Sequence, residues 1–472
     1  MIESELHTLC RTQTDWATKA IASRLDVVRA FRHLLAEQAP TLAKTACAGL
    51  QRDEAELVIT EILPLAEACK FLEKNATQIL KPRRPSLYTR PGWLMGVNTK
   101  ILREPFGIIA ILAPFNYPVF LPFVQAVHAL VAGNAVVVKP AHGGHAIAEA
   151  LARLLVEAGL PDGLIHVTDE SIEAGQALVD ANIDKLVLTG SAETGAKVLG
   201  ALASRAIPAI VELAGNDAMI ALPGADPAIV ADAVAYGLRL NSSQTCIAPR
   251  RLVIVGQSSE PLVNAILERV ASLPAATIPN VVCERLCALT TDLSFAAGTI
   301  DPQRFTPVVL TGVSEDADIL KADIFAPVIC MLSANDAVDA ARLVNASPFG
   351  LGTSIFGNAG DAEQLATRLN TGFVTINDII VPTADPRAPF GGTKSSGFGV
   401  TRGAEGLLEM TRPKTIFTRK GTFLPHLNPP LESDMHAYSH LLLALHGKGF
   451  TQRAKAFKTA LKGLIAQTKS GR

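Results

Sequence analysis

Short apolar runs that alternate with helical stretches constrain the fold of this chain more than any other feature of its sequence. Four runs come first, at residues 106–114, 135–140, 185–190 and 209–213. The stretch 145–161, between two of them, has apolar residues at three- and four-residue spacing, as an amphipathic helix does. Short buried strands that alternate with helices of this length form βαβ units around a parallel sheet. The sequence therefore predicts an α/β fold.

A second series of apolar runs predicts a second α/β domain that begins near residue 215. Its runs lie at residues 250–255, 306–312, 326–333, 350–357 and 371–378. Residues 1–81 precede both series and have helical spacing, and the proline-rich stretch 81–93 marks a connection. With 472 residues, of which 49% are hydrophobic and 18% charged, the chain can bury a large core.

Charge, cysteine content and the first residues argue against several functional classes. The formal net charge of −1 gives no reason to expect nucleic acid as a partner. The N-terminal residues are acidic and lack an apolar segment, so we expect no secretory signal, and no run approaches the ~18 apolar residues of a membrane span. The seven cysteines are scattered without paired CxxC motifs, which indicates free thiols in a reducing, cytoplasmic compartment and no metal site.

The tail, residues 436–472, has a charge pattern of its own. It contains no acidic residue, and its basic residues are Lys448, Arg453, Lys455, Lys458, Lys462, Lys469 and Arg472. The apolar residues Phe457, Leu461, Leu464 and Ile465 fall on one helical face. A basic amphipathic helix of this kind could make weak contact with an anionic membrane surface. The alternative, which we favour, is a helix packed on its own domain or on a neighbouring subunit.

Three residues are candidates for chemistry. Cys246, in NSSQTCIAP, could be a nucleophile if it has a nearby base and donors for the charge it creates, although an isolated cysteine is more often a buried structural thiol. Glu212 lies in the apolar run AIVEL, where a carboxylate is costly unless it is paired or useful; the alternative is a strand end that reaches solvent. Asn116, in LAPFNYP, could donate to an oxyanion or form an ordinary Asx-turn.

Two further segments could bind a ligand. Lys139 lies at the carboxyl end of the run 135–140, where parallel α/β proteins bind their ligands. GSAETG, at 190–195, is a glycine-bounded turn that leads from a strand into a helix, and such a turn offers backbone N–H groups to a phosphate. Taken singly, each of these signals is weak.

Together, these segments resemble the NAD(P)-dependent aldehyde dehydrogenase superfamily over roughly residues 20–420. The matching stretches, in order, are EPFGIIAILAPFNYP, AGNAVVVKPA, LTGSAETG, VELAGNDA, NSSQTCIAP, DIFAPV and PFGGTKSSGFG. NYP, QTCIAP and the NDIIV run at 377–381 are most similar to the class 3, or fatty-aldehyde, branch. The resemblance implies an aldehyde dehydrogenase-like fold, with a Rossmann-like cofactor domain, a second α/β catalytic domain and a small oligomerisation sheet.

The resemblance also implies a domain organisation. We expect an NAD(P)-binding domain at 1–214, a catalytic domain at 215–400, an oligomerisation strand at 401–420 and a basic tail at 421–472. A hairpin at 85–101 is expected to contribute to oligomerisation, and the protein is expected to be a homodimer or a homotetramer.

The resemblance assigns roles to residues. It makes Cys246 the nucleophile, whose thiolate attacks the aldehyde to give a thiohemiacetal, with Asn116 and the backbone N–H of Cys246 at the oxyanion. Hydride transfer to NAD(P)⁺ leaves a thioester, which water activated by Glu212 hydrolyses. The implied cofactor-binding residues are Lys139 at the adenosine ribose, Gly190 and Ser191 at the pyrophosphate, Gly195 for close packing, Phe325 beside the nicotinamide and Asp323 at its ribose.

The sequence departs from the family pattern at several positions. Asp323 stands where the family usually has Glu, Ala214 where it has Gly, and Asn216 where it has Lys. His142 stands where many relatives have the acidic residue that binds the 2′-hydroxyl of NAD, so we hypothesise that NADP is accepted or even preferred. The alternative is that His142 is a surface residue without effect. The chain between Cys246 and Asp323 is also shorter than this branch leads us to expect.

The predicted function is therefore the oxidation of an aldehyde to a carboxylic acid with NAD or NADP. Two alternatives stay open: a catalytically weakened protein of this fold that binds nucleotide or partners, and a variant that transfers the acyl group to coenzyme A. The presence of Cys246, Glu212, Asn116 and Lys139 favours the dehydrogenase. The apolar PVFLPF at 118–123 could line an entrance for a medium or long aliphatic or aromatic aldehyde, or could simply be the core face of a helix.

Overall fold

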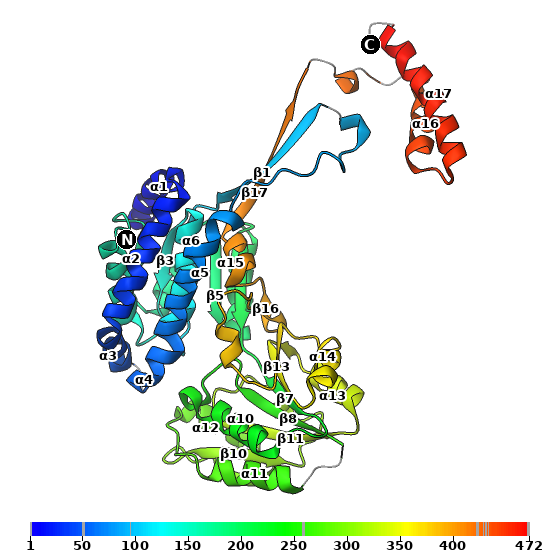
Figure 1. Cartoon of the computed structure of the whole chain (residues 1–472). Helices are drawn as coiled ribbons and strands as arrows, with labels where there is room; N and C mark the ends of the chain where they lie inside the picture. Colours follow the sequence, from blue (N-terminus) through cyan, green and yellow to red (C-terminus); the bar gives the residue numbers. More distant parts are fainter. Residues whose placement is uncertain are drawn as a thin grey trace. The chain divides into compact units, whose positions relative to one another are not determined.

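The chain folds into two compact units. A computed structural model describes residues 2–49, 52–94, 96–256, 260–421, 424–427, 429, 432 and 434–469. One unit comprises Met1–Arg83 with Ile101–Lys414, and the other comprises Arg84–Lys100 with Thr415–Arg472. The first unit contains two large sheets and their helices, labelled in Figure 1.

The first large sheet has six strands, in the order β16-β6-β5-β2-β3-β4. Its members are β2 (Ile108–Leu112), β3 (Ala135–Lys139), β4 (Ile165–Val167), β5 (Lys185–Gly190), β6 (Ala209–Leu213) and β16 (Gly397–Phe398). All pairs are parallel except that of β16 with β6, which is antiparallel. The four predicted strands of the first series are confirmed. The two-residue β16 was missed because two residues carry no periodic signal.

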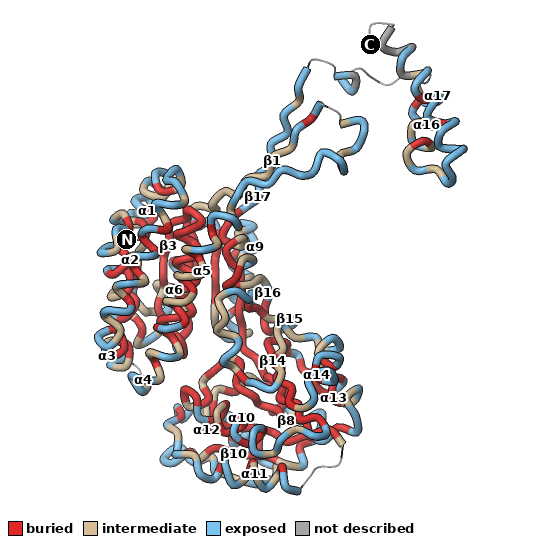
Figure 2. The backbone as a smooth tube through the Cα atoms, viewed as in Figure 1, coloured by how far each residue is buried: buried red, intermediate tan, exposed pale blue. Residues whose placement is uncertain are grey.

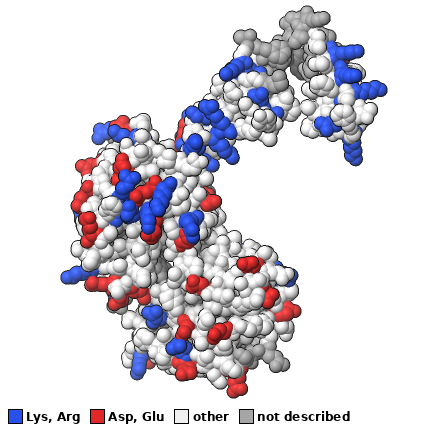
Figure 3. Space-filling model, in the orientation of Figure 1, with Lys and Arg blue, Asp and Glu red and all other residues white. Residues whose placement is uncertain are grey.

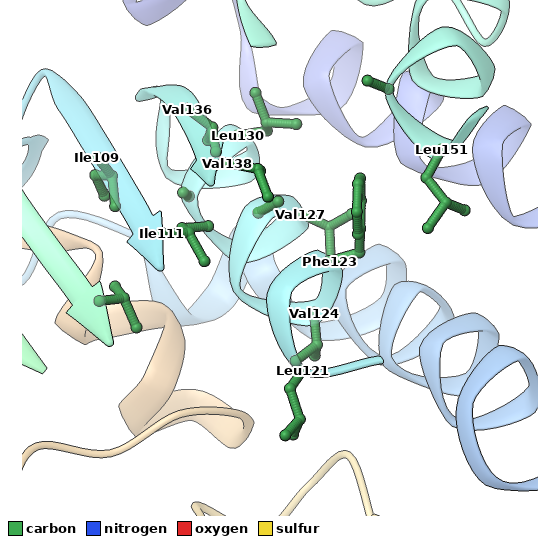
Figure 4. Packing of buried hydrophobic residues seen from close by; sticks show 14 of the residues in the cluster. Ile109, Ile111, Leu121, Phe123, Val124, Val127, Leu130, Val136, Val138 and Leu151 are labelled. Atoms are coloured by element: carbon green, nitrogen blue, oxygen red, sulfur yellow. The ribbon is translucent and has the colours of Figure 1, made fainter. Parts of the chain in front are cut away.

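Helices between these strands build the core of the first sheet. They are α6 (Phe120–Ala132), α7 (His145–Glu157), α8 (Ile172–Asp180) and α9 (Ala192–Ala203). Every residue of α6 is buried. Figure 4 shows Phe123 and Val127 of α6 beside Val138 of β3 and Ile111 of β2. The strands read as continuous apolar runs because helices pack against them and leave little of their surface to water.

The N-terminal residues form a helical layer on this core. Its helices are α1 (Ile2–Thr18), α2 (Ile21–Glu37), α3 (Ala39–Gly49), α4 (Glu54–Leu57) and α5 (Leu63–Ile79), with one π-helical turn, η1 (Val58–Ile62), before α5. The predicted helical character of residues 1–81 is confirmed. The indole N–H of Trp16 donates to the carbonyl oxygen of Leu130 at 2.8 Å and so attaches α1 to α6.

The second large sheet has seven strands, in the order β14-β13-β7-β8-β11-β10-β9. They are β7 (Asp217–Ala221), β8 (Pro249–Val255), β9 (Ser294–Thr299), β10 (Thr306–Thr311), β11 (Val328–Ala334), β13 (Gly352–Phe356) and β14 (Phe373–Ile376). Only the edge strand β9 is antiparallel. The predicted second series is confirmed. The strand β9 was not predicted because it is a mostly exposed edge strand of small and polar residues.

Further elements of the first unit surround the second sheet and join it to the first. The helices are α10 (Pro227–Arg239), α11 (Glu260–Ala271), α12 (Asn280–Leu289), α13 (Ala337–Asn345), α14 (Ala359–Ala366) and α15 (Gly403–Glu409). The short strands β12 (Phe349–Gly350) and β15 (Thr393–Lys394) pair antiparallel. Figure 2 shows buried residues concentrated along the strands and inner helices of this unit.

The second unit contains little buried surface. A two-stranded sheet joins β1 (Val97–Pro105) to β17 (Thr411–Arg419). The strand expected at 401–420 is thus confined to the second half of that range, because Gly403–Glu409 form the helix α15, and the strand within the expected hairpin 85–101 pairs with β17. Arg83 and Ile101 exchange two backbone hydrogen bonds of 2.9 and 2.8 Å, so the chain between them turns back on itself. The helices α16 (Asp434–His446) and α17 (Phe450–Lys469) pack on each other. Among the described residues, no helix combines the length and the apolar character needed to cross a bilayer.

Candidate active site

A cavity of about 1000 Å³ lies where the carboxyl ends of β2, β5 and β6 meet the loops of the second sheet. Seven of the residues proposed from the sequence line it: Cys246, Glu212, Asn116, Gly190, Ser191, Asp323 and Phe325. Lys139, His142 and Gly195 are not among its lining residues. Ligands of parallel α/β sheets bind at this end of the strands, so the structure brings most of the predicted site together at the expected place.

Cys246 lies in the loop between α10 and β8, among apolar side chains. Ile247, Leu351 and Phe390 form a buried cluster against which it packs. The residue is partly exposed, but desolvation of the thiol raises the pKa of Cys246 to about 12, and the carboxylates of Asp217 and Glu212 act in the same direction. The Cys246 thiol therefore needs a nearby base or cation to become a thiolate near neutral pH.

A left-handed turn precedes the cysteine. Asn241, Ser242 and Ser243 have φ angles of 48°, 52° and 59°, a region that non-glycine residues rarely occupy. Arg250 of β8 fastens the turn, because its Nη1 donates to the Ser243 hydroxyl at 2.7 Å. The backbone N–H of Asn241 donates to Glu56 at 3.1 Å. Contacts from distant parts of the chain thus stabilise a backbone that would not persist by itself.

Asn116 follows β2, and hydrogen bonds hold both its side chain and its backbone carbonyl group. Its side-chain Nδ2 donates to the carbonyl oxygen of Gln244 at 2.9 Å. Its own carbonyl oxygen accepts from Arg52 at 3.1 Å and from the Asn241 side chain at 3.0 Å. The neighbouring Tyr117 shares a 2.8 Å hydrogen bond with Thr245. The segment with Asn116 and the segment before Cys246 are therefore joined directly.

A buried ion pair supports Asn116 from the N-terminal helices. Arg52 pairs with Glu61, which is fully buried in the π-helical turn η1. The second oxygen of Glu61 accepts from the backbone N–H groups of Val119 and Phe120, at 2.8 and 3.0 Å, at the start of α6. A buried charge needs this degree of hydrogen bonding to be tolerated. In the sequence, the sign of this buried ion pair is Glu61 itself, a glutamate inside an apolar helical stretch.

Glu212 lies near the end of β6 and is almost completely buried, at 3% exposure. Burial raises the pKa of its carboxyl above the ordinary value, while a hydrogen bond from Thr401 and the positive charge of Arg402 oppose the shift. The strand β16 pairs with β6 directly at Glu212, through Gly397. A carboxylate with a raised pKa at a cavity wall suits a general base.

The nucleotide side of the cavity begins at α9. Ser191 caps this helix by accepting from the backbone N–H of Thr194 at 3.2 Å, and Gly190 precedes it. A Cβ on Gly195 would lie 2.8 Å from Leu213, so glycine allows α9 to approach β6 closely. The unpaired N–H groups at the start of such a helix favour a pyrophosphate.

Asp323 and Phe325 line the cavity from the loop before β11. One oxygen of Asp323 is buried without a hydrogen-bond partner, and burial raises the pKa of this carboxyl to about 6. An acceptor without a donor fits a ribose hydroxyl, so the shorter Asp is a suitable ligand here. The ring of Phe325 lies 5.8 Å from that of Phe115, beside Asn116.

The structure shows what surrounds Ala214 and Asn216, two positions at which the sequence departs from the family pattern. The close backbone contact that requires a glycine occurs at Gly215, where an added Cβ would lie 2.6 Å from the carbonyl oxygen of Cys246. Ala214 lines the cavity, which accommodates its methyl group. Asn216 is buried, and its Nδ2 donates to the carbonyl oxygen of Ala322 at 2.8 Å. Asn216 therefore fixes the loop that carries Asp323.

Lys139 and His142 lie outside the cavity, at the end of β3. Lys139 is half-buried beside Gly175, and burial lowers the pKa of its amine. His142 is exposed, but its Nδ1 lies 3.0 Å from a carboxylate oxygen of Glu170, in the loop after β4. The other oxygen of Glu170 accepts from the backbone N–H of Gly143 at 3.0 Å. The acidic residue that is missing at position 142 is thus supplied from a neighbouring loop.

Sequence reasoning did not identify Arg52, Glu170, Thr401 or Arg402. Thr401 and Arg402 follow SGFG in the last matching stretch, and only the fold brings them to Glu212, 189 residues away in the case of Thr401. Within the described ranges, no group of three or more His, Cys, Asp or Glu side chains is arranged to hold a metal ion.

The chain has two mainly parallel α/β sheets, and a thiol, an amide, a carboxyl group and a helix N-terminus meet at one cavity. These features define a nucleotide-dependent enzyme with a cysteine in its active site. Comparison with known proteins specifies the class. The family model described as "Aldehyde dehydrogenase family" matches residues 7–279 and 288–416. This chain therefore belongs to the aldehyde dehydrogenase family, whose members oxidise aldehydes with NAD or NADP.

Individual relatives cover most of the chain. A 4,4'-diapolycopene aldehyde oxidase of Methylomonas sp is 28% identical over 98% of this chain and 90% of its own length. An aldehyde dehydrogenase of Craterostigma plantagineum is 27% identical, covering 87% of this chain and 89% of that protein.

Solved structures have the same fold. The NADP-dependent glyceraldehyde-3-phosphate dehydrogenase from Bacillus halodurans, complexed with NADP, superposes with a TM-score of 0.81 at 27% identity, covering 89% of this chain and 91% of its own. A Mycobacterium tuberculosis aldehyde dehydrogenase complexed with NAD⁺ gives a TM-score of 0.81 at 25% identity, covering 89% and 90%.

Proposed function

We propose that this enzyme oxidises its aldehyde through a covalent thioester on Cys246. The observation that carries the proposal is the lining of one cavity by the Cys246 thiol, the Asn116 amide and the Glu212 carboxyl. A nucleophile, an oxyanion donor and a general base are the parts that acyl transfer to water requires.

The proposed sequence of steps begins with loss of the thiol proton to a base. The sulfur of Cys246 then bonds to the aldehyde carbon, and the new oxyanion accepts from the Asn116 Nδ2–H and the Cys246 backbone N–H. Bound NAD(P)⁺ supplies the hydride acceptor. Glu212 takes a proton from water, whose oxygen attacks the thioester, and the carbon–sulfur bond breaks to release the carboxylate.

We propose that the cofactor is held by residues from both sides of the cavity. Gly190, Ser191 and the N-terminus of α9 would receive the pyrophosphate, and Asp323 the nicotinamide ribose. Lys139 would hydrogen-bond the adenosine ribose near His142 and Glu170. In domain terms, residues 1–214 would bind the cofactor and residues 215–400 would carry the nucleophile.

Replacement of single site residues tests the mechanism. Cys246→Ala should abolish NAD(P)H formation with a medium-chain aldehyde such as hexanal, because no thiohemiacetal can form. Glu212→Gln should give one stoichiometric burst of NAD(P)H and a Cys246-linked acyl group visible by mass spectrometry. Unchanged steady-state turnover in Glu212→Gln would contradict the hydrolytic role.

We propose a medium or long aliphatic or aromatic aldehyde as substrate, as in the fatty-aldehyde branch. Apolar side chains from several elements line the cavity, among them Ile59, Phe120, Leu121, Val281, Leu286 and Leu289. A relative of this chain is named 4,4'-diapolycopene aldehyde oxidase, which indicates an aldehyde substrate for that protein. Comparison of kcat/KM for propanal, hexanal and decanal tests this proposal, which predicts a rise with chain length.

We also propose that the enzyme is a cytoplasmic homodimer or homotetramer joined through β17. Seven consecutive residues of this strand, 412–418, are exposed, and they include Ile416 and Phe417. A long exposed strand with apolar residues is a ready site for pairing. Light scattering on the purified chain should give two or four times the 49.8 kDa protomer mass, and Phe417→Asp should shift the protein toward monomer.

We propose two alternative contacts for the basic tail: packing on its own domain or a neighbouring subunit, which the sequence favours, and weak contact with anionic membranes. Among the described side chains of α16 and α17, the buried ones are Ala437, Ala444, Ala456 and Ala460, whereas Tyr438, Leu442, Phe457, Leu461 and Ile465 are exposed. Basic side chains are visible around these helices in Figure 3. Residues 84–100 and 415–472 together contain twelve Lys and Arg but two acidic residues, Glu432 and Asp434. Exposed apolar residues with flanking positive charge favour an anionic lipid surface.

Vesicle flotation tests the membrane proposal. The full chain should float with phosphatidylcholine vesicles that contain phosphatidylglycerol and not with phosphatidylcholine alone, and Lys455→Glu/Lys458→Glu/Lys462→Glu should abolish flotation. If neither vesicle type binds the chain, the apolar face of α16–α17 is a protein interface instead.

A further inference from the structure

Arg402 is a buried cation in the wall of the active-site cavity. Its residue exposure is 4%, and its guanidinium carbon lies 4.2 Å from the ring centre of Phe390 and 5.3 Å from that of Phe120. Its Nη1 donates to the carbonyl oxygen of Thr383, but its buried Nε has no hydrogen-bond partner. Burial of an incompletely paired charge costs free energy. Such a charge is expected to act on other groups in the cavity.

The backbone at Arg402 is also unusual. Its φ of 63° and ψ of 170° lie in a region that glycine adopts freely and other residues rarely do. Residue 402 is thus a strained position that carries a large cationic side chain. Strain of this kind persists where the surroundings fix the residue, and here the two aromatic rings and Thr383 do so.

Both proposed reacting groups lie among the neighbours of Arg402. Thr401, the preceding residue, donates its hydroxyl hydrogen to Glu212. Phe390, which stacks on the guanidinium, belongs to the cluster against which Cys246 packs. Arg402, Glu212 and Cys246 all line the same cavity. The cation therefore lies in the wall that the thiol and the carboxyl share.

Few other charges act on these two groups. The charged groups that act on Cys246 are the carboxylates of Asp217 and Glu212, which oppose ionisation of the thiol, and the cations Arg402 and Arg250 of β8, which favour it. Arg402 is the charged group that acts on Glu212, beside hydrogen bonds from Thr401 and Thr189. Burial opposes both anions, and Arg402 is the cation that acts on both of them, whereas Arg250 acts on Cys246 and is also paired electrostatically with Asp323 and Asp217.

We propose that Arg402 is an electrostatic positioning residue, which lets Cys246 become a thiolate and Glu212 a carboxylate inside an apolar cavity. This inference rests on the roles proposed above for Cys246 and Glu212. Aromatic stacking fixes the guanidinium without a carboxylate partner that would neutralise it. Arg402 thereby stabilises both the Cys246 thiolate and the Glu212 carboxylate, which act in successive steps of the proposed reaction.

Alkylation of Cys246 by iodoacetamide tests the inference without aldehyde or cofactor. The reaction of the thiolate is followed by mass spectrometry in the full chain at about pH 7 to pH 9, where the thiolate is a minor species. Arg402→Gly removes the charge and suits the local backbone. The Cys246 alkylation rate should fall about tenfold at each pH, which corresponds to a one-unit rise in thiol pKa.

Three comparisons separate charge from structure. Arg402→Lys, which keeps the charge, should react within a few-fold of the unsubstituted chain, and guanidinium ion at non-denaturing concentration should restore the rate of Arg402→Gly. Arg239→Met removes another arginine that lines the cavity but does not act on Cys246, and should leave the rate unchanged. If circular dichroism shows that Arg402→Gly is unfolded, Arg402→Gln takes its place.

An unchanged alkylation rate in the charge-free variant would overturn the inference. So would an equal loss of rate in Arg402→Lys together with no rescue by guanidinium, because both results indicate packing rather than charge. Failure of the unsubstituted enzyme to oxidise any aldehyde would instead overturn the proposed function, since alkylation involves no turnover.

Discussion

The side-chain amide of Asn116 donates a 2.9 Å hydrogen bond to the carbonyl oxygen of Gln244, two residues before Cys246. An amide nitrogen carries two hydrogens, so one remains for the cavity that Asn116 lines. Because Arg52 and Asn241 hold the backbone carbonyl of Asn116, the donor is in place before substrate binds. Donors fixed in advance stabilise a developing oxyanion without a cost of reorganisation.

Asn116→Ala is expected to lower kcat by about 10²–10³-fold, the usual loss for one oxyanion donor. The change is measured by NAD(P)H absorbance with hexanal. The Kd for NAD⁺ should change little, because Asn116 is not among the residues assigned to the cofactor. A kcat within a few-fold of the unsubstituted enzyme would exclude Asn116 from the oxyanion site.

Thr401→Val is expected to shift the acidic limb of the kcat–pH profile to higher pH. Burial raises the pKa of Glu212, and the Thr401 hydrogen bond lowers it by stabilising the ionised form. Glu212 is a base only when ionised, so turnover falls as pH drops through its pKa, and loss of the donor moves this fall upward. Thr353→Val is the matched control, since it removes a buried hydroxyl that lies outside the cavity.

Glu170→Gln is expected to increase the ratio of NADP⁺ to NAD⁺ affinity. The carboxylate of Glu170 stands beside His142, where a 2′-phosphate would be repelled by its charge. Calorimetric titration with both cofactors measures the ratio, and Glu173→Gln, in the first turn of α8 three residues after Glu170, is the control. A loss of melting temperature with an unchanged ratio would mean that Glu170 only caps α7.

Ile59→Glu is expected to lower kcat/KM for decanal several-fold more than for propanal. Ile59 is exposed and lines the cavity from η1, so a charge there would oppose entry of a long apolar chain. Ile172→Glu, at an equally exposed isoleucine of α8 outside the cavity, should leave both values unchanged. Equal effects on both aldehydes would place the entrance elsewhere.

Apolar runs located most of the buried strands of the two large sheets, although β4 and β7 were not predicted, and motif order indicated the candidate site residues. β2, β3, β5 and β6 were predictable because buried parallel strands are apolar on both faces. The family resemblance predicted that Asn116 and Cys246 lie in one site. In the structure, the hydrogen bond from the Asn116 side chain to the carbonyl oxygen of Gln244 joins their two segments.

Other parts of the site were beyond sequence reasoning because tertiary proximity creates them. His142 in place of an acidic residue suggested that a negative charge is missing at that position. In the fold, the carboxylate of Glu170, from the loop after β4, lies beside His142. Arg402 carries no local signal of a role, since its position is set by rings that lie 282 and 12 residues earlier in the chain.

The pairing of β16 with β6 has a consequence for how this enzyme can be divided or recombined. Gly397 and Phe398 come after the whole second sheet, yet they pair with Glu212 and Val211 of the first. A fragment that ended near residue 214 would contain Glu212 without Thr401, Arg402 or the strand beside it. The two halves therefore cannot be exchanged freely between related enzymes. In a chimaera joined near residue 214, the segment 390–402 should come from the same parent as the first half.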